Sequence, residues 1–186
     1  MDKLTGLLVR KEFIEQLDVE VKRVVRYRRP LTVLMVDIQH DYFHKDEDIR
    51  WSMGYSLIKQ MAAILQECYR NVDLLSRFEG EIFCVALPET GTEGAHIAAE
   101  RLRKMVEEHE FLSTQAGGTG GAEIKAHELV KTHVKVAVNV GVATYPEHSK
   151  NIDELLETAK RGMDQSRAAG GNQVVMGAVA PEEPAV

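Results

Sequence analysis

The sequence predicts one α/β domain in which a mixed central β-sheet is flanked by helices. Segments with apolar residues at three- and four-residue intervals alternate along the chain with short continuous apolar runs, which are typical of amphipathic helices and buried strands. A chain of 186 residues with 44% hydrophobic residues is also long and apolar enough for one core. We place the domain at residues 1–176 and predict a disordered tail at 177–186, which holds two prolines.

The first half of the domain is predicted to contain a helix, a strand and a second helix. Apolar residues recur with helical spacing through residues 10–27. After a proline, residues 31–36 form a continuous, partly β-branched run, which is typical of a strand buried on both faces. Asp37 is therefore expected at the end of a strand. The polar stretch 39–50 shows no period and predicts a loop before a helix at 53–69.

The second half is predicted to begin with a β-hairpin. Two apolar runs within residues 74–87 flank Glu79-Gly80, and the glycine permits the backbone conformation of a tight turn. The elements expected after it are a helix at 93–108, a glycine-rich mobile loop at 113–121, a strand at 134–143, a turn at Tyr145-Pro146, a helix from Asn151 or Asp153 to Ala169, and a short strand at 173–176.

Composition excludes several classes of function. The 23 basic residues against 29 acidic ones give a net charge of −6, which opposes indiscriminate binding to nucleic acid or to an anionic membrane, so any nucleotide needs a local site. No Gly-x-Gly-x-x-Gly follows the first strand, and Gly117 to Gly121 lacks the Lys and Ser/Thr of a phosphate loop. Cys68 and Cys84 lie in apolar segments and predict reduced core thiols of a cytoplasmic protein, without zinc.

Several short motifs occur together in a recognisable order. They are Asp2-Lys3-Leu4-Thr5-Gly6-Leu7, Val36-Asp37-Ile38, Arg77-Phe78-Glu79-Gly80-Glu81-Ile82-Phe83, Leu87-Pro88, Ala99-Glu100-Arg101-Leu102-Arg103, Asn139-Val140-Gly141-Val142-Ala143 and Ala168-Ala169-Gly170-Gly171-Asn172. In this order and spacing the chain resembles the GGDEF family from Asp2 to Met176. The resemblance implies a fold similar to nucleotidyl cyclases and polymerase palms, with a ferredoxin-like core. Active members join two GTP molecules into cyclic di-GMP across a homodimer.

The resemblance assigns Asp37 and Glu81 to metal-ligand positions, with Mg²⁺ as the implied ion. In that chemistry a 3′-hydroxyl attacks an α-phosphorus, and divalent ions held by carboxylates neutralise charge as pyrophosphate leaves. A carboxylate at the end of one strand and another in an adjacent hairpin turn can meet across neighbouring strands. Alternatively, Glu81 is only a solvated turn residue.

Other positions of the catalytic set depart from the family pattern. The signature runs from Glu79 to Phe83 as EGEIF, so an anion replaces a glycine and isoleucine replaces a carboxylate. The two guanine-reading positions match Asp46 and Tyr55, and the two phosphate-holding cations match Arg167 and Gly171. Transition-state stabilisation fails when one member of a set that acts as a unit is lost. We therefore expect no cyclase activity and assign no catalytic residue.

A second set of the family is intact. Arg70-Asn71-Val72-Asp73 ends six residues before Glu79, in the register of the family's RxxD inhibitory site for its product. A guanidinium can donate to guanine acceptors or to phosphate while a carboxylate accepts from guanine N–H groups. Arg101 resembles the secondary arginine that related domains contribute. The alternative is a plain surface ion pair between Arg70 and Asp73, worth at most ~1 kcal/mol.

Together these features predict a catalytically inactive GGDEF domain that binds cyclic di-GMP through Arg70, Asp73 and Arg101. Such a receptor needs no cofactor. Its expected partners are the dinucleotide, a second copy of the domain and fused or separate signalling domains, with no nucleic acid and no membrane contact. The alternatives are a residual metal-dependent diguanylate cyclase, a domain that binds GTP without turning it over, and a dimerisation or interaction module that binds neither nucleotide.

Overall fold

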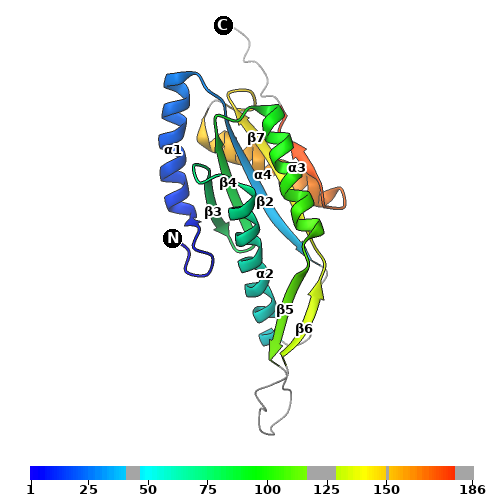
Figure 1. Ribbon diagram of the computed structural model, residues 1–186. Helices are drawn as coiled ribbons and strands as arrows, with labels where there is room; N and C mark the ends of the chain where they lie inside the picture. Colours follow the sequence, from blue (N-terminus) through cyan, green and yellow to red (C-terminus); the bar gives the residue numbers. More distant parts are fainter. Residues whose placement is uncertain (41–46, 117–128, 150, 179–186) are drawn as a thin grey trace.

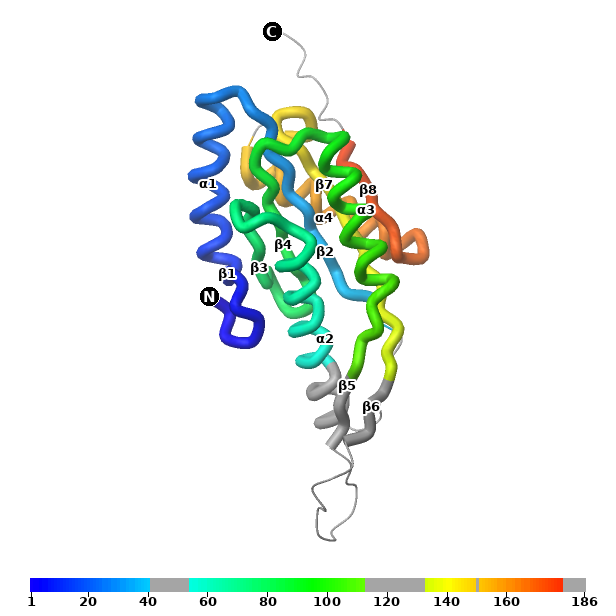
Figure 2. The backbone as a smooth tube through the Cα atoms, viewed as in Figure 1, coloured from blue at the N-terminus to red at the C-terminus, as the bar shows by residue number. Residues whose placement is uncertain are grey.

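The computed structural model describes residues 1–40, 47–116, 129–149 and 151–178. Its centre is a mixed six-stranded sheet in the order β1-β3-β4-β2-β7-β8 (Figure 1), and Figure 2 shows β1 and β8 at the two edges. The strands are β1 (Leu8–Val9), β3 (Leu74–Glu79), β4 (Ile82–Pro88), β2 (Leu31–His40), β7 (Val136–Tyr145) and β8 (Val174–Met176). The predicted mixed sheet is confirmed.

Four helices cover the two faces of the sheet (Figure 1). Helices α1 (Arg10–Tyr27) and α4 (Ile152–Ala168) pack on one face, and α2 (Glu47–Cys68) and α3 (Thr92–Glu108) pack on the other. The chain order β2-α2-β3-β4-α3-β7 with the sheet order β3-β4-β2-β7 is the ferredoxin-like arrangement. This confirms the fold that the resemblance implied.

Strand β2 is buried on both faces, as its apolar run predicted. Val33 and Met35 face the cluster formed with α1 and α4, whereas Leu34 and Val36 face the cluster formed with α2 and α3. By the same alternation Asp37 lies on the α1–α4 face. The packing of both faces against helices therefore decides where the first carboxylate lies.

Asp37 does not end its strand, so that prediction is wrong. Strand β2 continues to His40 and pairs with β7 along its whole length, from Leu31 opposite Tyr145 to His40 opposite Val136. The length of a strand depends on backbone pairing with a partner strand, which the polarity of the sequence does not reveal. The polar side chains after Val36 therefore gave no sign that the strand continues. Helix α2 likewise begins at Glu47, earlier than predicted.

A second, two-stranded sheet corrects the predicted loop at 113–121. Strand β5 (Phe111–Ala116) pairs antiparallel with β6 (Leu129–Val134), and this hairpin extends away from the main sheet (Figure 1). Its strands are rich in polar residues, and the backbone ladder satisfies the N–H and C=O groups that face the partner strand. The rest of the predicted loop, at 117–121, lies outside the described residues.

The other predicted elements are found close to their expected bounds. The β3–β4 hairpin has Gly80 at φ +55°, a conformation that favours glycine, and the side chain of Asn151 caps α4 by accepting the Glu154 N–H at 2.9 Å. Cys68 and Cys84 are buried free thiols. Within the described ranges no helix is long and apolar enough to span a bilayer. Of the predicted tail, 179–186 lies outside the description.

A buried histidine closes the turn between β7 and α4. The Nδ1 atom of His148 accepts the backbone N–H of Thr144 at 2.9 Å, so this nitrogen is unprotonated in the fold. Burial lowers the pKa of His148 below 6.5, against a smaller opposing effect of the Glu147 charge. Folding therefore favours the neutral imidazole.

This histidine predicts a loss of stability in weak acid. Between about pH 6.5 and the lower folded pKa, the unfolded chain binds the His148 proton more strongly, so the free energy of unfolding falls as pH is lowered through that window. His148→Gln is expected to lose this contribution and to show a shallower pH dependence. Urea unfolding at a series of pH values measures the difference, and equal slopes for both proteins would contradict it.

Candidate functional site

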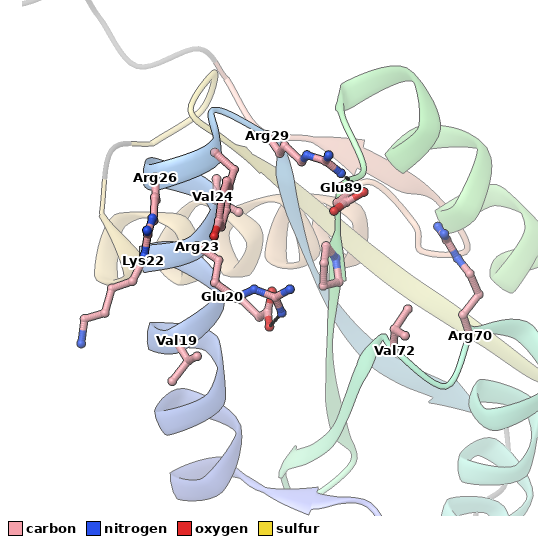
Figure 3. A pocket seen from close by; sticks show the side chains of 12 residues that line it. Val19, Glu20, Lys22, Arg23, Val24, Arg26, Arg29, Arg70, Val72 and Glu89 are labelled. Atoms are coloured by element: carbon pink, nitrogen blue, oxygen red, sulfur yellow. Dashed lines mark hydrogen bonds and ion pairs between the residues drawn. The ribbon is translucent and has the colours of Figure 1, made fainter.

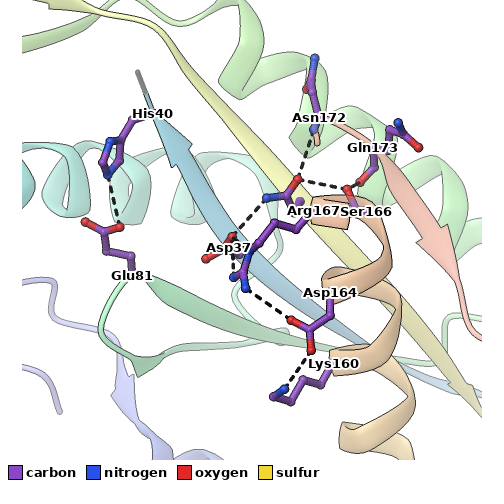
Figure 4. A network of polar contacts seen from close by, with 10 residues as sticks. Asp37, His40, Glu81, Lys160, Asp164, Ser166, Arg167, Asn172 and Gln173 are labelled. Carbon is purple, nitrogen blue, oxygen red and sulfur yellow. Dashed lines mark hydrogen bonds and ion pairs between the residues drawn. The ribbon is translucent and has the colours of Figure 1, made fainter. Parts of the chain in front are cut away.

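The first candidate site surrounds Asp37 (Figure 4). Asn139 lies opposite Asp37 across the β2–β7 ladder, and Arg167 reaches over from the last turn of α4. Oxygen Oδ2 of Asp37 accepts from Arg167 Nη2 at 2.8 Å, Arg167 Nε at 3.1 Å and Asn139 Nδ2 at 3.1 Å. The hydrogen bond to Asp37 raises the pKa of Arg167. The carboxylate is thus neutralised by a charge from this chain.

Residues that the sequence analysis assigned no role at the site hold this arrangement in place. Oxygen Oδ1 of Asn139 accepts from Ser166 Oγ at 3.1 Å and from the backbone N–H of Asn172 at 3.2 Å. Arg167 Nη1 also lies 3.5 Å from Asp164 Oδ1, and Lys160 donates to Asp164 at 2.9 Å. Position in the fold, rather than any spacing in the sequence, brings Asn139 and Ser166 to the site.

Glu81 lies in the β3–β4 turn and is engaged by a different base. Its Oε2 lies 3.3 Å from Nε2 of His40, which ends strand β2. Asp37 pairs with Ile82, the residue after Glu81, and the two carboxylates contact different partners, Arg167 and His40. Among the described residues no three His, Cys, Asp or Glu side chains gather as a metal site. One or two carboxylates suit Mg²⁺ when a ligand's phosphate oxygens complete the shell, and the metal role stays a prediction.

The altered signature positions lie around this site. Glu79 is exposed, and its carboxylate is 3.9 Å from Arg10. Ile82 packs against the core cluster under α1 and α4. A Cβ at Gly171 would come within 1.8 Å of Oε1 at the flexible end of Gln39, which would have to move, and the φ of +82° disfavours any side chain at this position. Asp46 lies outside the described residues, and Tyr55 is exposed on α2.

The second candidate site is the loop between α2 and β3. Asp73 Oδ2 accepts the backbone N–H of Arg70 at 2.8 Å, and the Asp73 N–H donates to the Arg70 carbonyl at 3.0 Å. The Asp73 side chain is only 2% exposed, and its Oδ1 is buried without a hydrogen-bond partner among the described residues. A buried acceptor of this kind costs free energy unless a donor reaches it. The loop therefore holds a buried acceptor that no donor among the described residues satisfies.

Two guanidinium groups accompany this carboxylate. The Arg70 side chain is 69% exposed, with its Nε 3.8 Å from Asp73 Oδ2, so it is loosely held and open to solvent. Arg101 on α3 donates from Nη2 to the carbonyl of Cys68 at 2.7 Å, at the end of α2. Hydrogen bonding to Cys68 raises the pKa of Arg101, with a smaller contribution from the Asp73 charge. The structure thus gathers all three predicted ligand-binding residues.

A groove of about 770 Å³ runs between α1 and this loop (Figure 3). Arg70 and Val72 form one wall and the second half of α1 forms the other. The cations that line it are Lys22, Arg23, Arg26, Arg29 and Arg70, against the two carboxylates Glu20 and Glu89. The lining is therefore positive overall on a chain of net charge −6, with Arg23 paired to Glu20 and Arg29 paired to Glu89. The sequence did not point to the α1 residues because they look like an ordinary solvated helix face.

Comparison with known proteins agrees with this geometry. The family model "Diguanylate cyclase, GGDEF domain" matches residues 1–173. The response regulator PleD of Caulobacter vibrioides is 32% identical over 175 residues, covering 94% of this chain and 35% of PleD. The chain thus spans about a third of that relative's length.

Solved structures share the fold. The FimX GGDEF domain of Pseudomonas aeruginosa superposes with a TM-score of 0.73 at 25% identity, covering 94% of this chain and 97% of that one. The GGDEF domain of DgcB from Caulobacter crescentus, solved in complex with c-di-GMP, gives a TM-score of 0.75 at 18% identity, covering 95% and 92%.

Proposed function

The chain belongs to the GGDEF family of diguanylate cyclase domains, and from that premise we propose that it is a catalytically inactive receptor for cyclic di-GMP. Arg70, Asp73 and Arg101 bind the dinucleotide. The observation that carries the proposal is the buried carboxylate of Asp73, whose Oδ1 has no partner among the described residues, beside the exposed guanidinium of Arg70.

The chemistry of these groups matches the ligand. Cyclic di-GMP presents guanine N–H donors, the N7 and O6 acceptors and two phosphates. The Asp73 carboxylate accepts from guanine N–H groups, and the Arg70 fork donates to N7 and O6 or to a phosphate. The groove beside Arg70 adds the positive charge that two phosphates require. The c-di-GMP complex of the DgcB domain, which has the same fold, supports this choice of ligand.

The altered signature supports the absence of catalysis. The exposed Glu79 carboxylate at the rim repels a triphosphate, and Gly171 leaves no cation where relatives hold phosphate. Arg167 is engaged with Asp37. The receptor needs no metal. Where a divalent cation binds, Asp37 and Glu81 would hold it, and the ion would supply charge neutralisation for phosphate oxygens.

Titration calorimetry with cyclic di-GMP, with cyclic di-AMP as the matched control and with GTP, tests the proposal. Heat is expected with cyclic di-GMP and not with cyclic di-AMP, because adenine lacks the N1–H and N2–H donors from which the Asp73 carboxylate would accept. GTP carries the same guanine, and heat with GTP would indicate a domain that binds GTP without turning it over. A flat cyclic di-GMP titration of folded protein overturns the receptor and leaves an interaction module. Incubation with GTP and Mg²⁺ or Mn²⁺, followed by chromatography, is expected to yield no cyclic di-GMP, and product formation would establish a residual cyclase.

Ligand binding would act by biasing how the domain pairs with a second copy or with signalling domains. The chain covers 35% of PleD, and we propose that such signalling domains are partners of this domain. The buried free thiols of Cys68 and Cys84 support a cytoplasmic setting.

A further inference from the structure

The carboxylate of Asp37 and its counter-ion differ in their access to solvent. The Asp37 side chain is 12% exposed, whereas the Arg167 side chain is 52% exposed. Two N–H groups of Arg167 and one of Asn139 converge on Oδ2 of Asp37. The buried anion is therefore held by a cation whose outer side remains in water (Figure 4).

We propose that Arg167 is an internal cation that competes with divalent metal for Asp37, so that the domain as folded excludes metal until the guanidinium leaves. Mg²⁺ binds oxygen at about 2.1 Å in a near-ideal octahedron, and because Arg167 and Asn139 both donate to Oδ2, a metal ion on the other oxygen of the carboxylate would lie beside the guanidinium. The guanidinium and the metal ion also carry like charges, which repel strongly in a partly buried site. This repulsion sets the two cations in competition for the one Asp37 carboxylate.

The guanidinium can leave without unfolding the site. Arg167 is in the last turn of α4, and Asp164, which lies one turn earlier at 3.5 Å, offers it a second anion. Asn139, by contrast, is fixed through Ser166 and Asn172. Exchange of Arg167 for a metal ion thus moves one long side chain, while the strands and α4 stay in place. The loop that holds Arg70 and Asp73 takes no part, so this inference stands apart from the dinucleotide receptor.

Mn²⁺ alone, followed by electron paramagnetic resonance, is the probe. Arg167→Met is expected to bind Mn²⁺ at least about tenfold more tightly than the unaltered chain, a difference of ~1.4 kcal/mol. Arg161→Met is the matched control, because Arg161 is on the same helix but donates to Thr158. It is expected to bind Mn²⁺ like the unaltered chain. Adding Asp37→Asn to Arg167→Met should remove the gain.

Equal Mn²⁺ affinity in Arg167→Met and the unaltered chain, or a gain that survives Asp37→Asn, overturns the proposal. A second measurement uses the unaltered chain, so it does not depend on how a variant folds. The Nε–H signal of Arg167 in NMR spectra, slowed in exchange by its bond to Asp37, is expected to shift and exchange faster as Mg²⁺ saturates the site. Saturation with this signal unchanged also overturns the proposal.

Discussion

Replacing Arg70 with alanine is expected to weaken cyclic di-GMP binding by at least about a hundredfold, because charge-assisted hydrogen bonds to the ligand are lost together. The fold is expected to be unaffected. The Arg70 side chain is 69% exposed, and its Nε approaches the buried Asp73 Oδ2 only to 3.8 Å, so this contact contributes little to stability. Calorimetry measures the affinity, and thermal unfolding verifies the fold.

Two further variants separate ligand binding from structure. Arg161→Ala removes an arginine of α4, on the opposite face of the sheet from α2 and α3, and should bind as the unaltered chain does. Asp73→Ala should lose both affinity and stability, because the Arg70 backbone N–H loses its acceptor. Wild-type affinity in Arg70→Ala would assign the loop a structural role alone.

Alanine at Gly141 is expected to destabilise the domain by more than ~3 kcal/mol, a large part of the 5–15 kcal/mol that stabilises a typical domain. Its Cβ would lie 1.8 Å from the carbonyl oxygen of Ala159 and 2.2 Å from the backbone nitrogen of Met163. Both atoms belong to the backbone of α4, so the helix itself must move. Urea unfolding at constant pH measures the loss.

Gly91→Ala is the matched control for this effect. A Cβ at Gly91 would meet Pro30 at 3.7 Å, an ordinary contact, and loss of a glycine at this helix N-cap costs about 1 kcal/mol or less. A Gly141→Ala protein with an unchanged urea midpoint would show that α4 does not pack as closely on β7 as described. Displacement of α4 would also carry Arg167 away from Asp37.

The two candidate sites differ in where their countercharges come from. At Asp37 the charge is met internally by Arg167 and Asn139, and Glu81 Oε2 lies 3.3 Å from Nε2 of His40. At Asp73 one carboxylate oxygen is held by the loop, while the other has no partner among the described residues. A site whose charges are already paired favours a stable resting fold, whereas an unsatisfied buried acceptor favours a ligand.

Much of the fold was predictable because its signals are local. Helical spacing placed α1 and α3 within a few residues, and the Asn151 cap marks the start of α4. Strands β5 and β6 were missed because pairing between two polar segments leaves no apolar period in either one. The length of β2 beyond Asp37 was missed for the same reason, since β7 supplies its partners.

By itself the sequence determined the α/β class, the buried central strand and the Arg70–Asp73 pair, whose members lie three residues apart and meet within one turn. Only the tertiary structure decided the pairing of Asp37 with Arg167, 130 residues away, and the burial that leaves Asp73 Oδ1 without a partner in the described chain. The physical reason is the distance along the chain over which each kind of interaction acts. Backbone preference and side-chain period act over a few residues, whereas burial and long-range charge pairing exist only after the sheet has brought distant segments together.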